Sequence, residues 1–525
     1  MNKLQLIFKN LIKCKTPQEL IDEGTNSELK KTLNAFDLII LGIGAVVGTG
    51  IFTIIGSAIV GSQDGAGAGT AIVISMLLAA IASVFSALSY SEIASMIPVA
   101  GSAYTYTYAT MGEFMAWMVG WILMLEYAIG NITVASAWTG YFVQFLKGFK
   151  HILPAFVVNC PLWLRNDYRT MYELCDKYGW NVHDKMPFLN LPFGIEIPFA
   201  INVPAIAIVF VLTLLLIKGV KESTKVATIM VGVNMFIILS FIVVGSFYVQ
   251  PENWGTSMAS FAPNGIEGIF TGAFVIFFAY IGFDAISTAA EETKNPQKDL
   301  PIAIMGTLLI CTILYVCAAL VLTGVVPFDS IDTQAPLAHA MRYIGRFHTG
   351  MIQFINFHAG LISVGALCAL TSVLLIYQLG TTRILWAMSR DSFLPKSLNK
   401  IHPKFKTPHV MTWLSGLVVI ICALFMDLNL SAELCNFGTF TSFIIICIAV
   451  LILRKTEPNR PRPFKVPFCP YFPIFGILIC LALMYYRFSA KATSALYFIV
   501  WLIIGIIIYA GYSYNSKRRE ESEQI

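Results

Sequence analysis

Four glycines, Gly42, Gly44, Gly48 and Gly50, fall within one uncharged stretch, LGIGAVVGTGIFTIIG (41–56). A glycine inside a helix costs about 1 kcal/mol relative to alanine, so this apolar segment gives up much of its intrinsic helicity. Gly48 and Gly50 are two residues apart and cannot share one helix face, which favours a break in the helix. Gly42 and Gly44 are equally compatible with close packing of helices.

A second apolar segment, GIFTGAFVIFFAYIGFDAIST (268–288), carries Gly282 and Asp284 close together near its end. Backbone N–H and C=O groups cannot be left unpaired in hydrocarbon. Interruptions at membrane depth therefore predict a cavity that is lined by protein or filled with water. We predict helix breaks at Gly48 and Gly282.

The two breaks together offer backbone groups for both ends of a zwitterion. The N–H groups at Thr49, Gly50 and Ile51 begin a helical segment, and such a positive helix end suits a carboxylate. Carbonyl groups near the breaks suit an ammonium group, and these are the carbonyls of Val46, Phe278, Ala279 and Ile281. The pattern predicts a bound α-amino acid.

Glu126 lies in the apolar sequence GWILMLEYAIGN (120–131). Because a buried carboxylate costs several kcal/mol, such a residue is a functional candidate. It is placed to bind a cationic side chain or to carry a proton, and the alternative is a structural carboxyl group hydrogen-bonded to its neighbours. For Asp284 we expect a structural role, capping the helical segment after the second break.

For the other ionisable residues near the predicted spans we expect structural roles and no contact with a substrate. Asp37 and Glu92 lie near helix ends and are expected to reach water. His358 is expected to be satisfied by hydrogen bonds. An ion-pair cluster at an inner gate is expected from three residues, Arg383, Arg390 and Asp391.

The composition is that of a membrane protein. The 525 residues are 57% hydrophobic and 12% charged, whereas a soluble domain has about 25% charged residues. Apolar runs of about 20 residues recur along the chain, as in transmembrane helices. We predict an all-α polytopic membrane protein with about twelve spans, near 34–61, 66–95, 112–146, 201–217, 225–249, 266–290, 301–325, 353–388, 409–426, 431–453, 471–487 and 494–515.

Charge and spacing suggest how these spans are organised. Most of the 35 Lys and Arg residues fall on one side of the membrane if both ends of the chain are cytoplasmic. The breaks lie in the first and sixth spans, which predicts two inverted repeats of five helices. The predicted parts are a tail (1–33), a first repeat (34–249), a second repeat (266–453), two further helices (471–515) and a tail (516–525).

One predicted outer loop, 147–200, is long, aromatic and balanced in charge. We expect it to be a folded cap and not a chemical site. It contains Cys160 and Cys175, which form a disulfide or remain two thiols, since an oxidising exterior permits either.

Several function classes lack their motifs in this chain. No C-x-x-C pair is present, so zinc and redox motifs are absent. The spans contain no H-E-x-x-H, G-x-S-x-G or paired catalytic aspartates, and the chain has no nucleotide-binding P-loop. We expect no enzyme activity, cofactor, metal or nucleic-acid partner.

Four blocks of sequence, in order, resemble the amino acid–polyamine–organocation superfamily in its cationic amino acid transporter branch. They are FDLIILGIGAVVGTGIF (36–52), SEIASMIPVAGSAYTYTYATMGEFMAWMVGWILMLEYAIG (91–130), FFAYIGFDAISTAAEETKNPQKDLPIAI (277–304) and GALCALTS with TTRILWAMSRDSFLP (365–395). The resemblance covers roughly 30 to 515, and twelve helices resemble the prokaryotic form.

The resemblance implies a five-plus-five inverted repeat with discontinuous helices 1 and 6 and two extra helices. A bundle of helices 1, 2, 6 and 7 would rock against a scaffold of helices 3, 4, 8 and 9. It also implies that the carboxylate and ammonium groups of the substrate bind at the two breaks. The positions are those of Val46, Thr49, Gly50, Phe278, Ala279 and Ile281. A glutamate, here Glu126, lies beside the site. Leu370 and its neighbours in helix eight would line the pocket.

The driving ion is left open by the sequence. Many prokaryotic relatives have a lysine, implicated in proton coupling, where this chain has Asn234. Animal members, which facilitate transport, resemble this chain in having asparagine there. Relatives that use sodium pair helix-one carbonyls with two hydroxyls of helix eight, for which Thr371 and Ser372 are the counterparts.

The sequence thus predicts an amino acid permease of the cell membrane that works by alternating access. Its expected partners are the lipid bilayer, a cationic or small neutral amino acid, and either H⁺, Na⁺ or no coupling ion. The alternatives are a carrier of polyamines or other organic cations and an amino acid sensor that does not transport. A polycation would need a large acidic pocket, and Glu126 is the one obvious deep acid.

Overall fold

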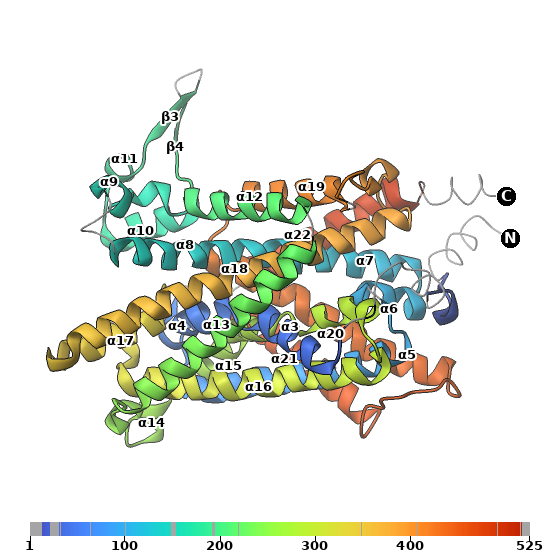
Figure 1. Cartoon of the computed structure of the whole chain (residues 1–525), viewed down its shortest axis with the longest axis horizontal. Coiled ribbons are helices and arrows are strands. Elements are labelled where there is room, and N and C mark those ends of the chain that lie inside the picture. Colours follow the sequence, from blue (N-terminus) through green and yellow to red (C-terminus); the bar gives the residue numbers. More distant parts are fainter. Residues whose placement is uncertain are drawn as a thin grey trace.

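The computed structural model describes residues 13–20, 31, 33–62, 65–99, 101–148, 154–191, 195–218, 220–347, 349–405, 407–490, 492–514 and 516. Long helices cross the molecule in one general direction (Figure 1). Among the described residues, nine helices are long and apolar enough to cross a membrane. The number is ten if the bent pair Ala35–Val46 and Gly50–Val60 is counted as one span. The predicted class, an all-α polytopic membrane protein, is confirmed.

The first part of the chain forms six helices interrupted by two wide turns. The helices are α3 (Ala35–Val46), α4 (Ile55–Val60), α5 (Ile72–Met96), α6 (Ser102–Met111), α7 (Glu113–Met124) and α8 (Gly130–Gly148). Turns of π-helix over Gly50–Ile54 and Leu125–Ile129 interrupt the first and third predicted spans. A hairpin of β1 (Gly61–Ser62) and β2 (Gly65–Ala66) and a 3₁₀ turn (Gly69–Ala71) precede α5.

The start of α3 is fixed by its own sequence. The Asn34 side chain accepts hydrogen bonds from the backbone N–H groups of Phe36 and Asp37, and the Asp37 carboxylate accepts one from Asn34 N at 3.0 Å. This reciprocal capping box satisfies N–H groups that have no partner inside the helix. Asp37 is half-exposed, as expected.

The segment between α8 and the next membrane helix is folded. It contains α9 (Ala155–Val158), a 3₁₀ turn (Leu162–Leu164), α10 (Tyr168–Tyr178), α11 (Val182–Lys185), and the antiparallel strands β3 (Phe188–Leu191) and β4 (Ile195–Pro198). A small core of Met171, Met186 and Ala200 holds it together. Cys160 and Cys175 are both free thiols.

The middle of the chain contains the second interrupted helix. Its elements are α12 (Val203–Lys218), α13 (Val220–Ser246), a 3₁₀ turn (Pro251–Trp254), α14 (Met258–Phe261), α15 (Gly265–Ile276), 3₁₀ segments over Phe277–Tyr280 and Phe283–Glu292, and α16 (Pro296–Val325). The last part has α17 (Pro336–Phe347), α18 (Ile352–Arg390), α19 (His409–Cys422), α20 (Leu428–Thr456), α21 (Tyr471–Ala490) and α22 (Ala492–Ile508), with 3₁₀ turns at Phe328–Ser330, Thr349–Met351 and Lys396–Asn399 and a π turn at Tyr509–Ser513.

Each of the twelve predicted ranges overlaps one of these apolar helices. α12 and α19, with 16 and 14 residues, are apolar but shorter than the about 20 residues that a straight span needs. The exact number of spans and the inverted repeat therefore stay predictions.

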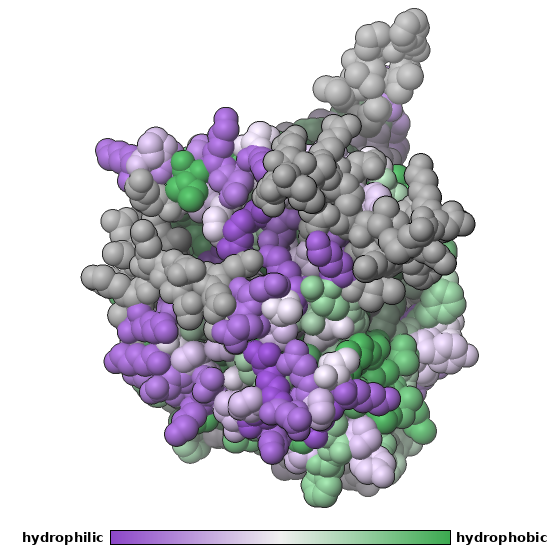
Figure 2. Space-filling model, turned by 90° about the vertical axis from the view of Figure 1, so that its right-hand side faces the viewer, coloured by the Kyte–Doolittle hydropathy of each residue, from purple (hydrophilic) through white to green (hydrophobic). Residues whose placement is uncertain are grey.

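The two ends of the bundle differ in what they carry. Lys15 pairs with Asp391 at 3.0 Å, and the Ser513 hydroxyl donates to Phe393 O at 2.8 Å, so residues from near both ends of the chain meet at one end of the bundle. We call this the terminus end; among the described residues its face carries many hydrophilic side chains, with an apolar area at the lower right (Figure 2). The opposite end carries α9 to α11 and β3–β4 and is called the loop end (Figure 1).

Side chains on the outer helices are apolar and exposed. Examples are Ile229 (69%), Phe236 (66%), Leu309 (64%) and Ile507 (63%) on α13, α16 and α22. In water such a surface would be unfavourable, because removing apolar area from water is favoured by about 25 cal/mol of free energy per Å². It suits contact with lipid tails.

Candidate functional site

The first broken helix changes direction at Val47 and Gly48. α3 ends at Val46, and the axis beyond the break is inclined to α3 by 40°. A Cβ atom on Gly48 would lie 2.5 Å from Val373 Cγ2. No side chain fits there, so α18 can approach the break closely.

The second broken helix changes direction at Ile281 and Gly282. α15 tightens into the 3₁₀ turn Phe277–Tyr280, Ile281 is extended, and Gly282 has φ +110°. Only glycine adopts this backbone conformation without strain. A second 3₁₀ segment, Phe283–Glu292, begins after it.

The two breaks touch one another. A Cβ atom on Gly50 would lie 2.2 Å from Ala279 Cβ, and one on Gly282 would lie 3.0 Å from Ala45 O. The glycines therefore allow two backbones to meet where both helices are open. Gly42 and Gly44 have a different role, because they pack against Ile286 and Val231 respectively.

Hydrogen bonds from neighbouring helices hold the carbonyl groups of the breaks. Tyr315 Oη donates to Val46 O at 3.0 Å, and Asn234 Nδ2 donates to Val47 O at 2.8 Å. Tyr377 Oη lies 3.5 Å from Ile281 O. A carbonyl oxygen has two lone pairs, so each of these groups can accept one more hydrogen bond.

Several buried polar atoms beside the first break have no hydrogen-bond partner among the described residues. They are Thr49 Oγ1, Thr53 Oγ1, Asn234 Oδ1 and Ser372 Oγ, all on residues at most 2% exposed. An unsatisfied buried polar atom costs about 1–3 kcal/mol. A cluster of such atoms is typical of a place that receives a polar ligand.

Ser372 and Thr371, the two adjacent hydroxyl residues predicted in helix eight, face different parts of the structure. Ser372 Oγ is 3.6 Å from where a Cβ of Gly44 would lie, and so it faces the first broken helix. Thr371 instead accepts a hydrogen bond from Trp138 Nε1 at 3.1 Å and donates to Leu367 O at 2.6 Å. Leu370 is fully buried.

Glu126 lies in the π turn Leu125–Ile129 and is 1% exposed. Neither oxygen of its carboxylate has a hydrogen-bond partner among the residues described here. The Cys435 thiol donates to the backbone carbonyl of Glu126 at 3.2 Å, and the Asp284 carboxyl and the Thr439 hydroxyl lie near the Glu126 side chain. A π turn widens a helix and often occurs at functional sites.

Asp284 belongs to the same buried cluster as Glu126. Its Oδ2 accepts hydrogen bonds from Tyr127 Oη at 2.5 Å and Ser102 Oγ at 3.3 Å. Gly282, not Asp284, occupies the N-cap position of the 3₁₀ segment, and no side chain caps it. Asp284 thus joins the second broken helix to α6 and to the π turn that carries Glu126.

The expected ion-pair cluster of Arg383, Arg390 and Asp391 is wrong. Arg383 pairs with Glu292 at 3.5 Å, near the end of the second broken helix. Asp391 pairs with Lys15 and accepts a hydrogen bond from Tyr104 at 2.6 Å. The Arg390 guanidinium lies 5.3 Å from the Trp386 ring centre. Seven residues separate Arg383 from Arg390, nearly two full turns, which puts them at different heights along α18.

The expectation that Glu92 reaches water is wrong, and the expectation that His358 is hydrogen-bonded holds for one of its two ring nitrogens. Glu92 does not reach water, because it is 1% exposed and bound by Arg454 (2.6 Å), Arg462 (3.4 Å) and Val466 N (2.7 Å). His358 Nε2 lies 3.2 Å from Ser240 Oγ. Its Nδ1 has no partner among the described residues.

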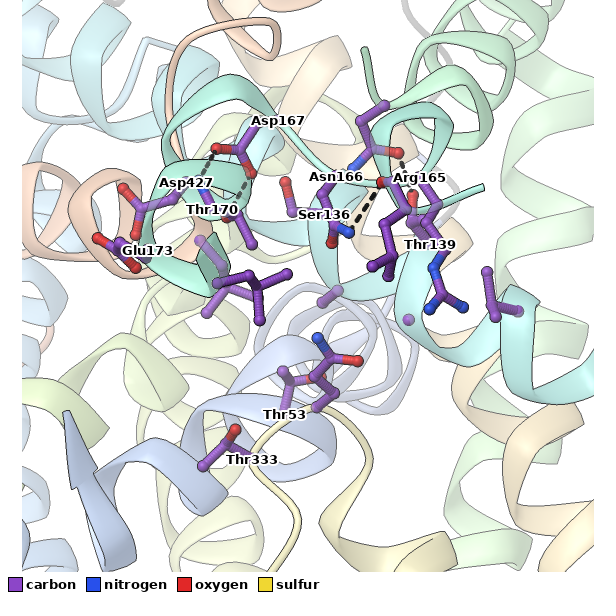
Figure 3. A pocket seen from close by; sticks show the side chains of 18 of the residues that line it. Thr53, Ser136, Thr139, Arg165, Asn166, Asp167, Thr170, Glu173, Thr333 and Asp427 are labelled. Atoms are coloured by element: carbon purple, nitrogen blue, oxygen red, sulfur yellow. Dashed lines mark hydrogen bonds between the residues drawn. The ribbon is translucent and has the colours of Figure 1, made fainter. Parts of the chain in front are cut away.

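Two cavities approach the breaks from opposite ends of the bundle. The cavity at the terminus end has about 190 Å³ and is lined by Asp37, Gly44, Glu292 and Arg383 among others. The cavity at the loop end has about 440 Å³ and reaches Thr53, beyond the breaks (Figure 3). Gly44 and Thr53 lie on either side of the first break.

The groups that organise the breaks have no local signal in the sequence. Tyr315 and Tyr377, which hold the backbone carbonyls, lie far along the chain in α16 and α18 and look like ordinary membrane tyrosines. The π turn Leu125–Ile129 itself contains no glycine or proline that would mark it in the sequence. The described residues contain no group of three or more His, Cys, Asp or Glu that could hold a metal ion.

Comparison with known proteins gives a consistent family assignment. Residues 33–511 match the family model described as amino acid permease. A branched-chain amino acid permease of Bacillus subtilis is 40% identical over 96% of this chain and 98% of its own length. A methylthioribose transporter of the same bacterium is 39% identical over the same shares, and a chloroplastic cationic amino acid transporter of Arabidopsis thaliana is 33% identical over 94% of this chain and 79% of its own.

Proposed function

The chain belongs to the amino acid permease family, and we propose that it binds a zwitterionic α-amino acid between its two helix breaks. It is a multi-pass membrane transporter and not an enzyme. The proposal concerns where the substrate binds, which side chains it accepts and what drives it.

The contact between the two breaks is the observation that carries the proposal. Gly50 and Ala279 meet there, and carbonyl groups from both helices surround the contact. The substrate carboxylate would bind the N–H groups at Thr49, Gly50 and Ile51, and its ammonium group would bind the carbonyls near Val46, Phe278, Ala279 and Ile281. Uncharged dipoles of this kind avoid the desolvation of an ionised side chain in the membrane.

Glu126 would face the remainder of the substrate. Its carboxylate is buried without a hydrogen-bond partner among the described residues, which supports either a proton on the group or a cationic side chain beside it. We propose that a neutral amino acid travels with a proton on Glu126, whereas a cationic one replaces that proton. Both substrate classes then use one site.

Sodium is a weaker candidate for the coupling ion. A sodium site would need both Thr371 and Ser372 next to helix-one carbonyls. Thr371 bonds to Trp138 instead, which supports the proton over sodium. Asn234 donates to Val47 O, so we propose that it holds the break rather than moving an ion.

The two cavities support alternating access. One ends at Gly44 and the other at Thr53, on opposite sides of the first break. We propose that rocking of the broken helices connects the site to each cavity in turn. For location we propose the cell membrane with the terminus end in the cytoplasm, as the distribution of Lys and Arg favours.

Uptake into proteoliposomes tests this function. Labelled leucine and labelled arginine should both enter, and an inward proton gradient should accelerate leucine more than arginine. Replacing external sodium with choline should change neither rate. Failure of both amino acids to enter or exchange would contradict the proposed function, and a strict need for sodium would contradict the coupling.

A further inference from the structure

The cavity at the loop end has an unequal distribution of charge. It lies between α4 and α8 on one side and the folded loop around α10 on the other, with a volume of about 440 Å³. That volume is within the range of small-molecule pockets, about 300–1,000 Å³. Acidic side chains gather at one side of it, and Arg165 lies at the opposite side (Figure 3).

Three carboxylates line the acidic side, and two of them share one cation. Arg169 Nε lies 3.2 Å from both Glu173 Oε1 and Asp427 Oδ1. Asp167 and Asp427 are each 3% exposed and also cap helices, Asp167 at α10 and Asp427 at α20. One guanidinium leaves this side with net negative charge, which attracts an ammonium group.

Opposite the acidic side the cavity is lined by Arg165, and Lys147, on which the charge of Arg165 acts, lines it as well. Neither has an ion-pair partner within the part of the chain that the structure describes. A guanidinium binds a carboxylate through two parallel hydrogen bonds. This side therefore suits the other end of a zwitterion.

A buried hydroxyl group at the floor of the cavity is a second, independent feature that indicates a bound ligand. The Thr53 hydroxyl is 2% exposed, lines the cavity and has no hydrogen-bond partner among the described residues. Thr53 lies within the π turn that begins at Gly50, so the floor continues into the first break. Leu162, Leu174 and Trp180 add apolar lining for a side chain.

We propose that this cavity is a second amino acid site, in which the substrate waits before it reaches the helix breaks. The ammonium group faces Glu173 and Asp427, and the carboxylate faces Arg165 and Lys147. This rests on the proposed function, because the same zwitterion occupies both sites. The folded loop is then part of the binding machinery, whereas the sequence predicts only a cap.

Equilibrium binding of labelled leucine to the purified full-length chain tests the second site. The wild type should bind two leucines per chain with different affinities. R165Q should weaken one of the two by about tenfold, the effect of losing a charged hydrogen bond, while R165K restores part of it. K177Q removes an exposed cation of the same loop that does not line the cavity and should bind like wild type.

Two outcomes separate this proposal from the proposed function. If R165Q binds as wild type does, or if the wild type binds one leucine per chain, the second site is wrong while uptake still supports a permease. If G50A keeps both binding events and full uptake, the site at the breaks is wrong. Monodisperse elution and an unchanged melting temperature identify variants that are folded.

Discussion

Two polar regions follow each other along the first broken helix, and they obtain their polarity from different sources. Around Gly50 and Gly282 most polar groups are backbone N–H and C=O dipoles and buried hydroxyls, with the two buried carboxyl groups of Asp284 and Glu126 beside them. Beyond Thr53, the loop-end cavity is lined by ionisable side chains, with Arg165 across from Glu173, Asp167 and Asp427.

The difference follows from the solvent around each region. Burying an isolated ion in a low-dielectric medium is far more costly than burying a dipole that is already fixed by the fold. The membrane interior therefore favours backbone groups exposed by helix breaks. At the loop end Lys147 is exposed and Arg165 and Glu173 are partly exposed, so solvent can screen opposite charges that lie on different sides of the cavity.

The largest effect is expected where the backbones touch. In G50A the new methyl group would lie 2.2 Å from Ala279 Cβ, forcing the breaks apart. A displacement of about 1 Å can reduce a rate roughly a hundredfold, so leucine uptake should fall by about that factor. The matched control is G232A in α13, where a Cβ meets nothing within 4 Å; equal uptake by the two variants would contradict the role of the contact.

E126Q should have the next largest effect. It keeps the size of the side chain but removes the proton-carrying carboxylate, which should lower arginine uptake by about tenfold or more, because hydrogen bonds to charged groups contribute about 1.5–3 kcal/mol. E252Q, at an exposed position, is the control. If E126Q transports both amino acids with wild-type kinetics, Glu126 is not part of the substrate site.

Y315F should have a smaller effect on the same region. It removes the hydrogen bond from Tyr315 Oη to Val46 O and leaves the ring in place. A neutral hydrogen bond contributes about 1 kcal/mol, so uptake should fall about fivefold. Initial rates over a range of leucine concentrations measure this, and an unchanged rate would mean that Val46 O does not depend on Tyr315.

The smallest effect concerns the charged cavity and its response to pH. Burial raises the pKa of the Glu173 carboxyl above its ordinary value, and nearby Asp427 adds to this. As pH falls towards that raised pKa, the carboxylate is lost earlier than for an ordinary glutamate, and its attraction for an ammonium group goes with it. KM for leucine should rise about twofold on mild acidification, a size expected of a partly exposed group.

E173Q provides the comparison for this pH effect. Its KM should already be raised at neutral pH and should change less with acidification than that of the wild type. A larger pH response in E173Q than in the wild type would place the titrating group elsewhere.

The sequence predicts those features that have a local cause. Glycine spacing marks both places where the helices break, since helix propensity and φ are properties of single residues. Apolar runs mark the helices for the same reason. The buried Glu126 stands out because a charge within an apolar run is rare.

Features that depend on contacts between distant segments were not predictable. Nothing in the local sequence says that Tyr127 would bind Asp284, or that Arg383 would pair with Glu292 rather than join Asp391. The π turn at Glu126 and the charge separation between Arg165 and Glu173 likewise arise only once the helices pack. Two residues of one helix can share a partner when they are three or four positions apart, on one face and within about one turn.

The central claim is that the helix breaks recognise both charged ends of an α-amino acid. Competition against uptake of labelled leucine, in the R165Q background so that the second site is weakened, tests it most directly. Unlabelled leucine should compete fully, whereas leucinamide, which lacks the carboxylate, and 4-methylpentanoate, which lacks the ammonium group, should each compete at least tenfold more weakly. If either analogue competes as well as leucine, the backbone groups at the breaks do not bind the substrate as proposed.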